Sequence, residues 1–173
     1  MSKSDSHYKT EQIILRPAQT DDEAFLYQLY ESTRKEEVSA FGWDVAQQET
    51  FLKFQFTAQR SHYEMAYPAA THTIILVNDQ PAGRILVFRA EQEIHLVDIA
   101  LLPEYRGHGI GAELIGGLIE EAAAKGVPLK LHVEKHNRAA RLYDRLGFTV
   151  IADTGVYYEM ARLPMGRQQS GPL

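Results

Sequence analysis

The fold is decided by one stretch, Ile94-His-Leu-Val-Asp-Ile-Ala-Leu-Leu-Pro-Glu-Tyr-Arg-Gly-His-Gly-Ile-Gly-Ala112, and by the amphipathic run that follows it to Ala124. The stretch begins as a nearly continuous apolar segment, which predicts a buried strand that ends at Pro103. Glycines at alternate positions then predict a turn, and a helix follows. Its apolar residues recur at helical spacing: Ile110, Leu114, Ile115, Leu118, Ile119 and Ala122.

The glycine-rich turn has the properties of an anion site. The first turn of a helix carries backbone N–H groups without internal partners, and the helix dipole adds positive charge there. Gly107, Gly109 and Gly111 let the backbone approach an anion closely, while Arg106 and His108 supply charge or hydrogen bonds beside it. An ordinary turn is the alternative for a lone Gly-x-Gly. Three glycines between a buried strand and a helix favour a pyrophosphate site.

Length and composition predict one globular domain that binds no nucleic acid. The 173 residues suggest a single domain over 11–164, with a flexible segment at 1–10 and a polar tail at 165–173. The net charge is −5 and no basic block occurs, so charge gives no reason to expect a nucleic-acid partner. A negatively charged protein that binds an anion must concentrate its positive charge locally.

The residue types present exclude several kinds of site. The sequence has no cysteine, which excludes disulfides, a thiolate nucleophile and zinc–thiolate centres. Its seven histidines are scattered along the chain, so we expect no metal. No run approaches the ~18 apolar residues of a membrane helix, and residues 1–10 lack a signal-peptide core. We expect a cytoplasmic protein without a membrane partner.

The N-terminal half predicts one strand and two helices. Residues 12–16 form a short apolar strand. Thr20 and Glu23 have the spacing of a capping box, which predicts a first helix to about Arg34. A second helix is predicted to begin after Asp44 and to run to about Arg60.

Aromatic and amide side chains in this half are candidates for lining a pocket. Residues 62–68 are predicted as an aromatic loop. Trp43, Gln55, Gln59 and Tyr63 can line a pocket mouth, although packing in the core is the alternative for each of them.

The remaining segments predict a sheet that is mostly antiparallel. A hairpin around Asn78-Asp79 joins two strands, and a second turn leads into the strand that opens at Ile94. The central helix ends at Lys125-Gly126, and a right-handed crossover places the next strand parallel to the Ile94 strand. Asn137 then begins a short helix that stops at Gly147. The strands lie at 71–77, 81–89, 129–133, 148–152 and 156–161.

Two motifs carry a family resemblance. Arg106-Gly-His-Gly-Ile-Gly111 and Asn137-Arg-Ala-Ala-Arg-Leu-Tyr143 resemble the pyrophosphate loop and the Asn-x-x-Ala-x-x-Leu-Tyr segment of the GNAT superfamily of N-acetyltransferases. The order of elements also matches. The resemblance implies an α/β (α+β) fold with a mixed, mostly antiparallel sheet of about seven strands, flanked by helices, in which the two central parallel strands splay apart.

The resemblance also implies acetyl-CoA as the cofactor, a small-molecule or peptide amine as the acceptor, and a possible homodimer. Backbone groups of Ile99 and Leu101 would hold the pantetheine arm like an added strand, with Asn137 and Ala140 beside it. The pyrophosphate would lie on the loop residues Arg106, Gly107, His108, Gly109, Ile110, Gly111 and Ala112. Tyr143 would lie near the sulfur as the general acid that protonates the departing thiolate, and the Ile99 N–H would stabilise the oxyanion.

The proton acceptor for the amine is less well defined by the sequence. By strand alternation, His95 shares a face with Ile99, so it is a candidate base acting through water, with a solvent-facing histidine as the alternative. Asp98 falls on the opposite face unless a bulge shifts the register. It is a candidate for binding a cationic amine, or for a structural ion pair with Arg84 on the neighbouring strand.

Two other functions fit parts of the sequence. Gly107-x-Gly109-x-x-Ala112 also satisfies the dinucleotide fingerprint of an oxidoreductase, with Glu134 as the ribose-binding acid. The late position of the motif and the antiparallel strands before it argue against a doubly wound sheet. A non-catalytic acetyl-CoA sensor is the second alternative, because a fold and a cofactor site do not guarantee turnover.

Overall fold

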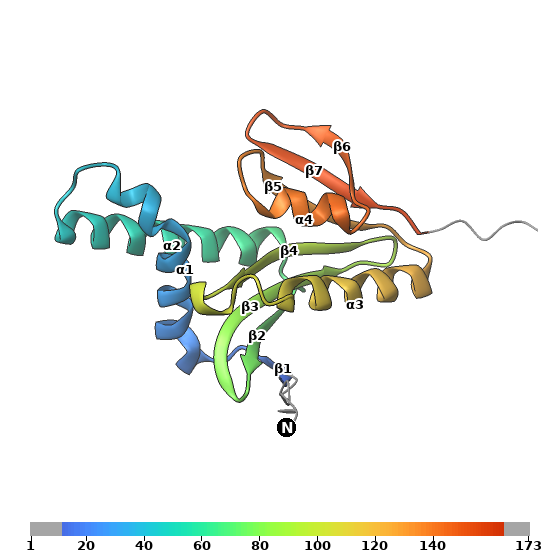
Figure 1. Ribbon diagram of the computed structural model, residues 1–173, viewed down its shortest axis with the longest axis horizontal. Coiled ribbons are helices and arrows are strands. Elements are labelled where there is room, and N and C mark those ends of the chain that lie inside the picture. Colours follow the sequence, from blue (N-terminus) through green and yellow to red (C-terminus); the bar gives the residue numbers. More distant parts are fainter. Residues whose placement is uncertain (1–11, 165–173) are drawn as a thin grey trace, which may run out of the picture.

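The computed structural model describes residues 12–164, which form one seven-stranded sheet with helices on both faces (Figure 1). The predictions for residues 1–10 and 165–173 lie outside the described residues. The strand order is β1-β2-β3-β4-β5-β7-β6, and only β4 and β5 are parallel. The strands are β1 (Ile13–Pro17), β2 (Thr71–Val77), β3 (Gln80–Arg89), β4 (Ile94–Leu101), β5 (Leu129–Glu134), β6 (Thr149–Asp153) and β7 (Tyr157–Arg162). The predicted mixed, mostly antiparallel sheet is confirmed.

Four α-helices cover the two faces of the sheet. They are α1 (Glu23–Ser39), α2 (Val45–Ala66), α3 (Ile110–Lys125) and α4 (Ala139–Arg145), and short 3₁₀ turns occupy Thr20–Asp22 and Pro103–Tyr105. The main core packs α3 and α4 against one face. A second cluster packs α1 and α2 against the other face. Figure 1 shows α3 and α4 in front of the sheet and α2 passing behind it.

At three places the predicted residues form the turn or the helix end that the sequence indicates. Asn78 and Asp79 both have positive φ (50° and 65°), as a tight two-residue hairpin requires. The Asp44 carboxylate accepts the Gln47 N–H at 2.8 Å and begins α2. Gly126 ends α3 in the left-handed conformation.

The two helices of the N-terminal half differ from the prediction at their ends. The Asp22 carboxylate, rather than Glu23, closes the first turn by accepting the Gln19 N–H at 2.8 Å, because the carboxylate is held in place by Arg16 at 2.7 Å. The predicted cap at Thr20 is therefore wrong by one residue. Helix α2 runs six residues beyond Arg60, since no glycine or proline interrupts it before Pro68. Tyr63 accordingly lies on a helix and not in a loop.

The two parallel strands separate after three residue pairs. Residues 94–96 of β4 pair with residues 129–131 of β5, and each strand then continues without the other. Beyond that point β5 follows β7, with which it pairs along its whole length. The predicted gap between the central strands is confirmed. A sheet with one parallel pair does not fit the doubly wound alternative.

A bulge at Val97 decides which side chains of β4 face which helices. Leu86 of β3 lies opposite Asp98 while Val87 lies opposite Leu96, so β4 carries one extra residue between them. Leu96 and Ile99 therefore both face the main core under α3. His95 and Asp98 share the other face, toward α1 and α2. The prediction that His95 and Ile99 share a face is wrong, because strict alternation does not survive the bulge.

Candidate active site

The loop before α3 presents a row of free backbone amides. Gly107 and Gly109 have φ of +78° and +83°, and a Cβ built on either one meets nothing within 4 Å. Among residues 12–164, no hydrogen-bond acceptor is found for the N–H groups of residues 107 to 112. They open a helix of 16 residues whose dipole favours an anion at this end. This loop fits a pyrophosphate.

Arg106 braces this loop instead of pointing away from the protein. Its Nε donates to the Leu101 carbonyl at 2.8 Å, and its Nη2 donates to the Ser32 hydroxyl at 3.3 Å. His108 is exposed. Arg106 thus ties the loop to the end of β4 and to α1, and these two hydrogen bonds engage its guanidinium.

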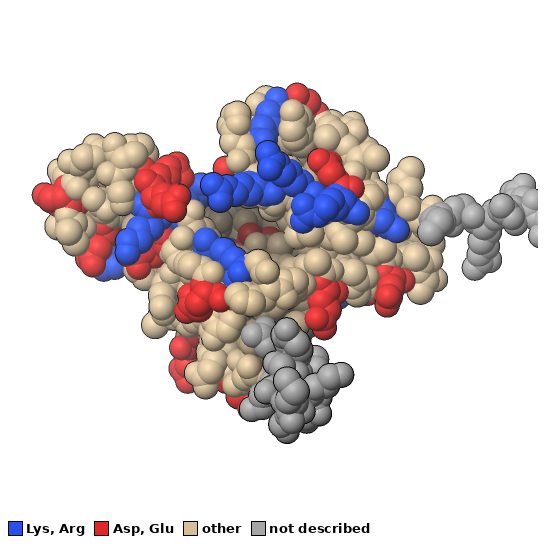
Figure 2. Space-filling model, viewed as in Figure 1, with Lys and Arg blue, Asp and Glu red and all other residues tan. Residues whose placement is uncertain are grey.

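Positive charge gathers around this face although the protein is negative overall. Figure 2 shows lysine and arginine side chains around a hollow, over α4 and beside the start of α3. On and just before α4 three exposed side chains contribute, Arg138, Arg141 and Arg145. This local concentration of charge suits a ligand with several phosphates.

The edge of β4 that borders the gap offers backbone groups to an extended ligand. The Leu102 N–H points toward β3, where it donates to the Ala82 carbonyl at 2.8 Å. Because successive residues of a strand point their N–H groups to opposite sides, Leu101 and Ile99 point theirs into the gap. The Leu101 carbonyl already accepts from Arg106. The Ile99 and Leu101 amides can therefore bind a ligand strand.

Helix α4 supplies the other wall of the gap. The Asn137 Oδ1 accepts the Ala139 N–H at 2.8 Å, which leaves the amide nitrogen of this side chain as its donor. Ala140 is half-buried against the core. Tyr143 is buried and packs edge-on against Phe148. Burial, and secondly the charge of Asp98, raise the pKa of Tyr143 to about 12, so the phenol keeps its proton at neutral pH.

On the side of the sheet that faces α1 and α2, the gap is bordered by a polar cluster, here called the acceptor-side cluster. It consists of Gln59, Tyr63, Arg84 and Asp98. Arg84 is buried; its Nε donates to Asp98 at 2.7 Å and its Nη2 to Gln59 at 2.7 Å. The guanidinium also lies 5.8 Å from the centre of the Tyr63 ring. The predicted ion pair is present, although Arg84 lies opposite Ala100 in the register and reaches Asp98 diagonally.

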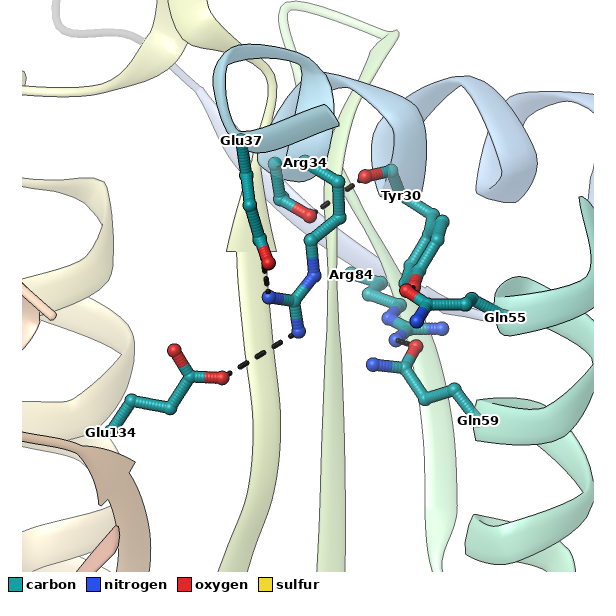
Figure 3. Close-up of polar contacts among 8 residues, drawn as sticks. Tyr30, Arg34, Glu37, Gln55, Gln59, Arg84 and Glu134 are labelled. Atoms are coloured by element: carbon teal, nitrogen blue, oxygen red, sulfur yellow. Dashed lines mark hydrogen bonds and ion pairs between the residues drawn. The ribbon is translucent and has the colours of Figure 1, made fainter. Parts of the chain in front are cut away.

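A second polar group extends this cluster across the gap (Figure 3). Arg34 of α1 reaches Glu134 at the end of β5 at 3.6 Å and Glu37 at 3.1 Å. The Tyr30 hydroxyl donates to Gln55 at 3.1 Å. The sequence analysis missed Arg34 and Tyr30, since nothing in a helix of mixed polarity shows which turn faces a gap. Glu134, the ribose-binding candidate of the dinucleotide alternative, forms an ion pair with Arg34.

The structure does not bring Trp43 to the other candidate acceptor residues. Trp43 precedes α2 and packs with Phe41 and Phe51, at ring distances of 4.9 and 5.1 Å. Tyr63 lies about 30 Å away along the same helix, at ~1.5 Å per residue. Trp43 is thus part of an aromatic cluster at the far end of the α1–α2 pair.

Within residues 12–164, no group of three or more His, Asp or Glu side chains is placed to hold a metal ion. In the same part of the chain, no helix is both long and apolar enough to cross a membrane.

The two glycines that flank α3 allow a matched test of the amide loop. Gly109 and Gly126 both have left-handed φ, so alanine at either position should cost about 1 kcal/mol of unfolding free energy. Of the two, only Gly109 lies at the proposed anion site, because Gly126 is at the opposite end of α3. We expect Gly109→Ala to raise the Kd for coenzyme A by at least about 10-fold in calorimetric titration, and Gly126→Ala to leave it unchanged. Equal Kd values for the two variants would contradict the site.

Comparisons with known proteins agree with this geometry. Residues 25–148 match the acetyltransferase (GNAT) family. A curated relative, the [ribosomal protein bS18]-alanine N-acetyltransferase of Haemophilus influenzae, is 30% identical over 117 residues, which cover 67% of this chain and 78% of the relative.

Solved structures share the fold. PaiA N-acetyltransferase of Thermoplasma acidophilum, crystallised with coenzyme A, has a TM-score of 0.65 at 19% identity, covering 88% of this chain and 99% of that one. The ribosomal-protein-S18-alanine N-acetyltransferase of Escherichia coli has a TM-score of 0.58 at 23% identity, covering 91% and 98%. The chain belongs to the GNAT family and is an acetyl-CoA-dependent N-acetyltransferase.

Proposed function

We propose that this enzyme transfers the acetyl group of acetyl-CoA directly to the α-amino group of a peptide or protein. A primary amine is the acceptor class that the sequence analysis predicts. A peptide terminus is favoured over a small molecule because two relatives, from H. influenzae and E. coli, are named for acetylating an alanine of a ribosomal protein.

The observation that carries the proposal is the alignment of three donor groups along one gap. The amides of residues 107–112 are free to bind the pyrophosphate, the Ile99 and Leu101 amides can bind the pantetheine arm, and Tyr143 lies on the far wall. Asn137 and Ala140 would contact the same arm. Acetyl-CoA supplies an activated thioester. The Ile99 N–H then stabilises the oxyanion, and the Tyr143 phenol protonates the departing sulfur.

The acceptor enters from the face of the sheet that carries α1 and α2. Tyr143 and the amide loop belong to the α3 and α4 side, so the thioester meets the amine through the gap between β4 and β5. Asp98 and Glu134 border the acceptor side, each paired with an arginine, and their carboxylate oxygens can accept hydrogen bonds from an ammonium group. Gln55 and Tyr63 line its wall on α2.

A panel of three acceptors tests this proposal. The candidates are a hexapeptide with a free N-terminal alanine, the same peptide with a blocked terminus and one internal lysine, and spermidine. Thiol release and mass spectrometry of the products measure transfer. We expect the highest kcat/KM for the free N-terminus. Transfer to spermidine alone would contradict the peptide acceptor, and the absence of transfer to all three would contradict both acceptor classes.

A further inference from the structure

Two histidines face each other at the point where β4 and β5 separate. The Nδ1 of His132 lies 3.2 Å from the Nε2 of His95, and the rings are stacked with centroids 5.1 Å apart. His95 is only 5% exposed, whereas His132 is exposed. One imidazole is thus anchored inside the protein, and the other presents its free Nε2 outward.

The pair lies on the acceptor side of the gap. His132 directly follows Leu131, the last residue of β5 that pairs with β4. It alternates with Leu131, whose side chain is in the main core, so His132 faces away from α3 and α4. The bulge at Val97 begins at the same level of β4. An amine that approaches the thioester through the gap therefore passes close to His132.

The hydrogen bond between the rings decides what His132 can do. In a neutral pair one nitrogen must donate and the other must accept. When His132 donates its Nδ1–H to His95, its outward Nε2 carries a lone pair and can take up a proton. When it takes that proton, the His95 nitrogen still accepts from Nδ1 and stabilises the imidazolium, as the carboxylate does in a hydrolase triad.

We propose that His132 is the general base that removes a proton from the acceptor ammonium, and that His95 is the positioning residue that selects its reactive tautomer. The inference rests on the proposed transfer to an amine. It assigns the base to a residue that the sequence analysis did not consider and gives His95 an indirect role.

The protons and bonds balance with these residues. Of the three protons on the ammonium nitrogen, one goes to His132 Nε2 and then to solvent. The freed lone pair forms the bond to the carbonyl carbon, and the carbon–sulfur bond breaks. A second proton replaces the one that Tyr143 gives to the sulfur, and the third stays on the amide.

Titratable groups of α2, β5, β7 and the turn before β4 lie near the pair. The Tyr67 ring at the end of α2 lies 5.3 Å from the His95 ring. Glu159 of β7 lies opposite His132 in the register, and Lys130 pairs with Glu93 at 2.6 Å. Burial first, and the charge of His132 second, lower the pKa of His95, while Glu93 and Glu159 act in the opposite direction. Burial therefore favours the neutral form of His95.

The pH dependence of kcat/KM for the alanine hexapeptide tests this assignment. An α-amine with pKa near 8 is only about 10% neutral at pH 7, so an enzyme without its base should lose about 10-fold there and almost nothing at pH 9. We expect His132→Ala to show this pattern. His95→Phe, which keeps a ring in the stack but no acceptor for Nδ1–H, should show a smaller loss with the same pH dependence.

The controls separate this inference from the proposed function and from misfolding. His62→Ala, an exposed histidine of α2, should match the wild type at every pH. ¹⁵N spectra of the wild-type imidazoles at neutral pH should show His132 protonated at Nδ1. A pH-independent loss in His132→Ala, or a neutral His132 protonated at Nε2, would overturn the assignment. Absence of transfer by the wild type would instead contradict the proposed acceptor.

Discussion

Tyr143→Phe is expected to lower kcat by at least about 100-fold, which corresponds to ~2.7 kcal/mol of transition-state stabilisation. Phenylalanine fills the same space against Phe148 but has no proton to give to the departing sulfur. The Kd for acetyl-CoA should stay within about twofold, because the amide loop and the edge of β4 are unchanged. Steady-state kinetics with calorimetric titration measure both quantities.

The pH profile and a second tyrosine check this interpretation. A phenol with a pKa of about 12 stays protonated across the usual assay range, so Tyr143 should cause no loss of activity between pH 7 and about 10. Tyr105→Phe, which removes a hydroxyl from another residue packed against the same core, should leave kcat unchanged. Equal kcat values for Tyr143→Phe and the wild type would rule out the general acid.

Gly83→Ala is expected to destabilise the protein by about 3 kcal/mol or more. Gly83 is buried in β3, and a methyl group there would overlap the carbonyl oxygen of Ala100 and lie 2.8 Å from Cδ2 of Leu101. The obstacle is backbone, so β4 must move away from β3. The movement would displace the Ile99 and Leu101 amides, and coenzyme A binding should weaken with stability.

The same substitution in α3 is the control for this effect. Gly117 is exposed on the helix, and an added Cβ there meets nothing within 4 Å. Gly117→Ala should therefore stabilise the protein by about 0.5–1 kcal/mol, because alanine favours the helix. Urea unfolding compares the two variants. A Gly83→Ala protein as stable as the wild type would mean that β3 and β4 are not packed as described.

Local signals in the sequence predict much of the fold. The Asn78-Asp79 hairpin, the start of α2 at Asp44 and the end of α3 at Gly126 depend on backbone requirements that few residue types satisfy. The glycine loop belongs to the same class, since its conformation and its free amides both follow from neighbours in sequence. The GNAT fold and the cofactor class came from the resemblance of this loop and of the Asn137–Tyr143 segment to the family's motifs.

The acceptor side depends on contacts between distant segments, and the sequence predicts it poorly. The bulge at Val97 moves Ile99 away from the face of His95, and no residue type marks that position. Trp43 is chemically suited to a pocket but lies at the wrong end of α2. The sequence does indicate that His132 faces away from the main core, because polar side chains alternate with buried ones along β5. A cytoplasmic location and a homodimer remain predictions.

Amide chemical shifts measured during titration with coenzyme A test the central claim most directly. The claim is that free amides before α3 hold the pyrophosphate while the edge of β4 holds the pantetheine arm. We predict that the largest shifts fall on residues 107–112, with further shifts at Ile99 and Leu101. Largest shifts elsewhere, for example along the groove between Leu15 and Gly117, would contradict the account.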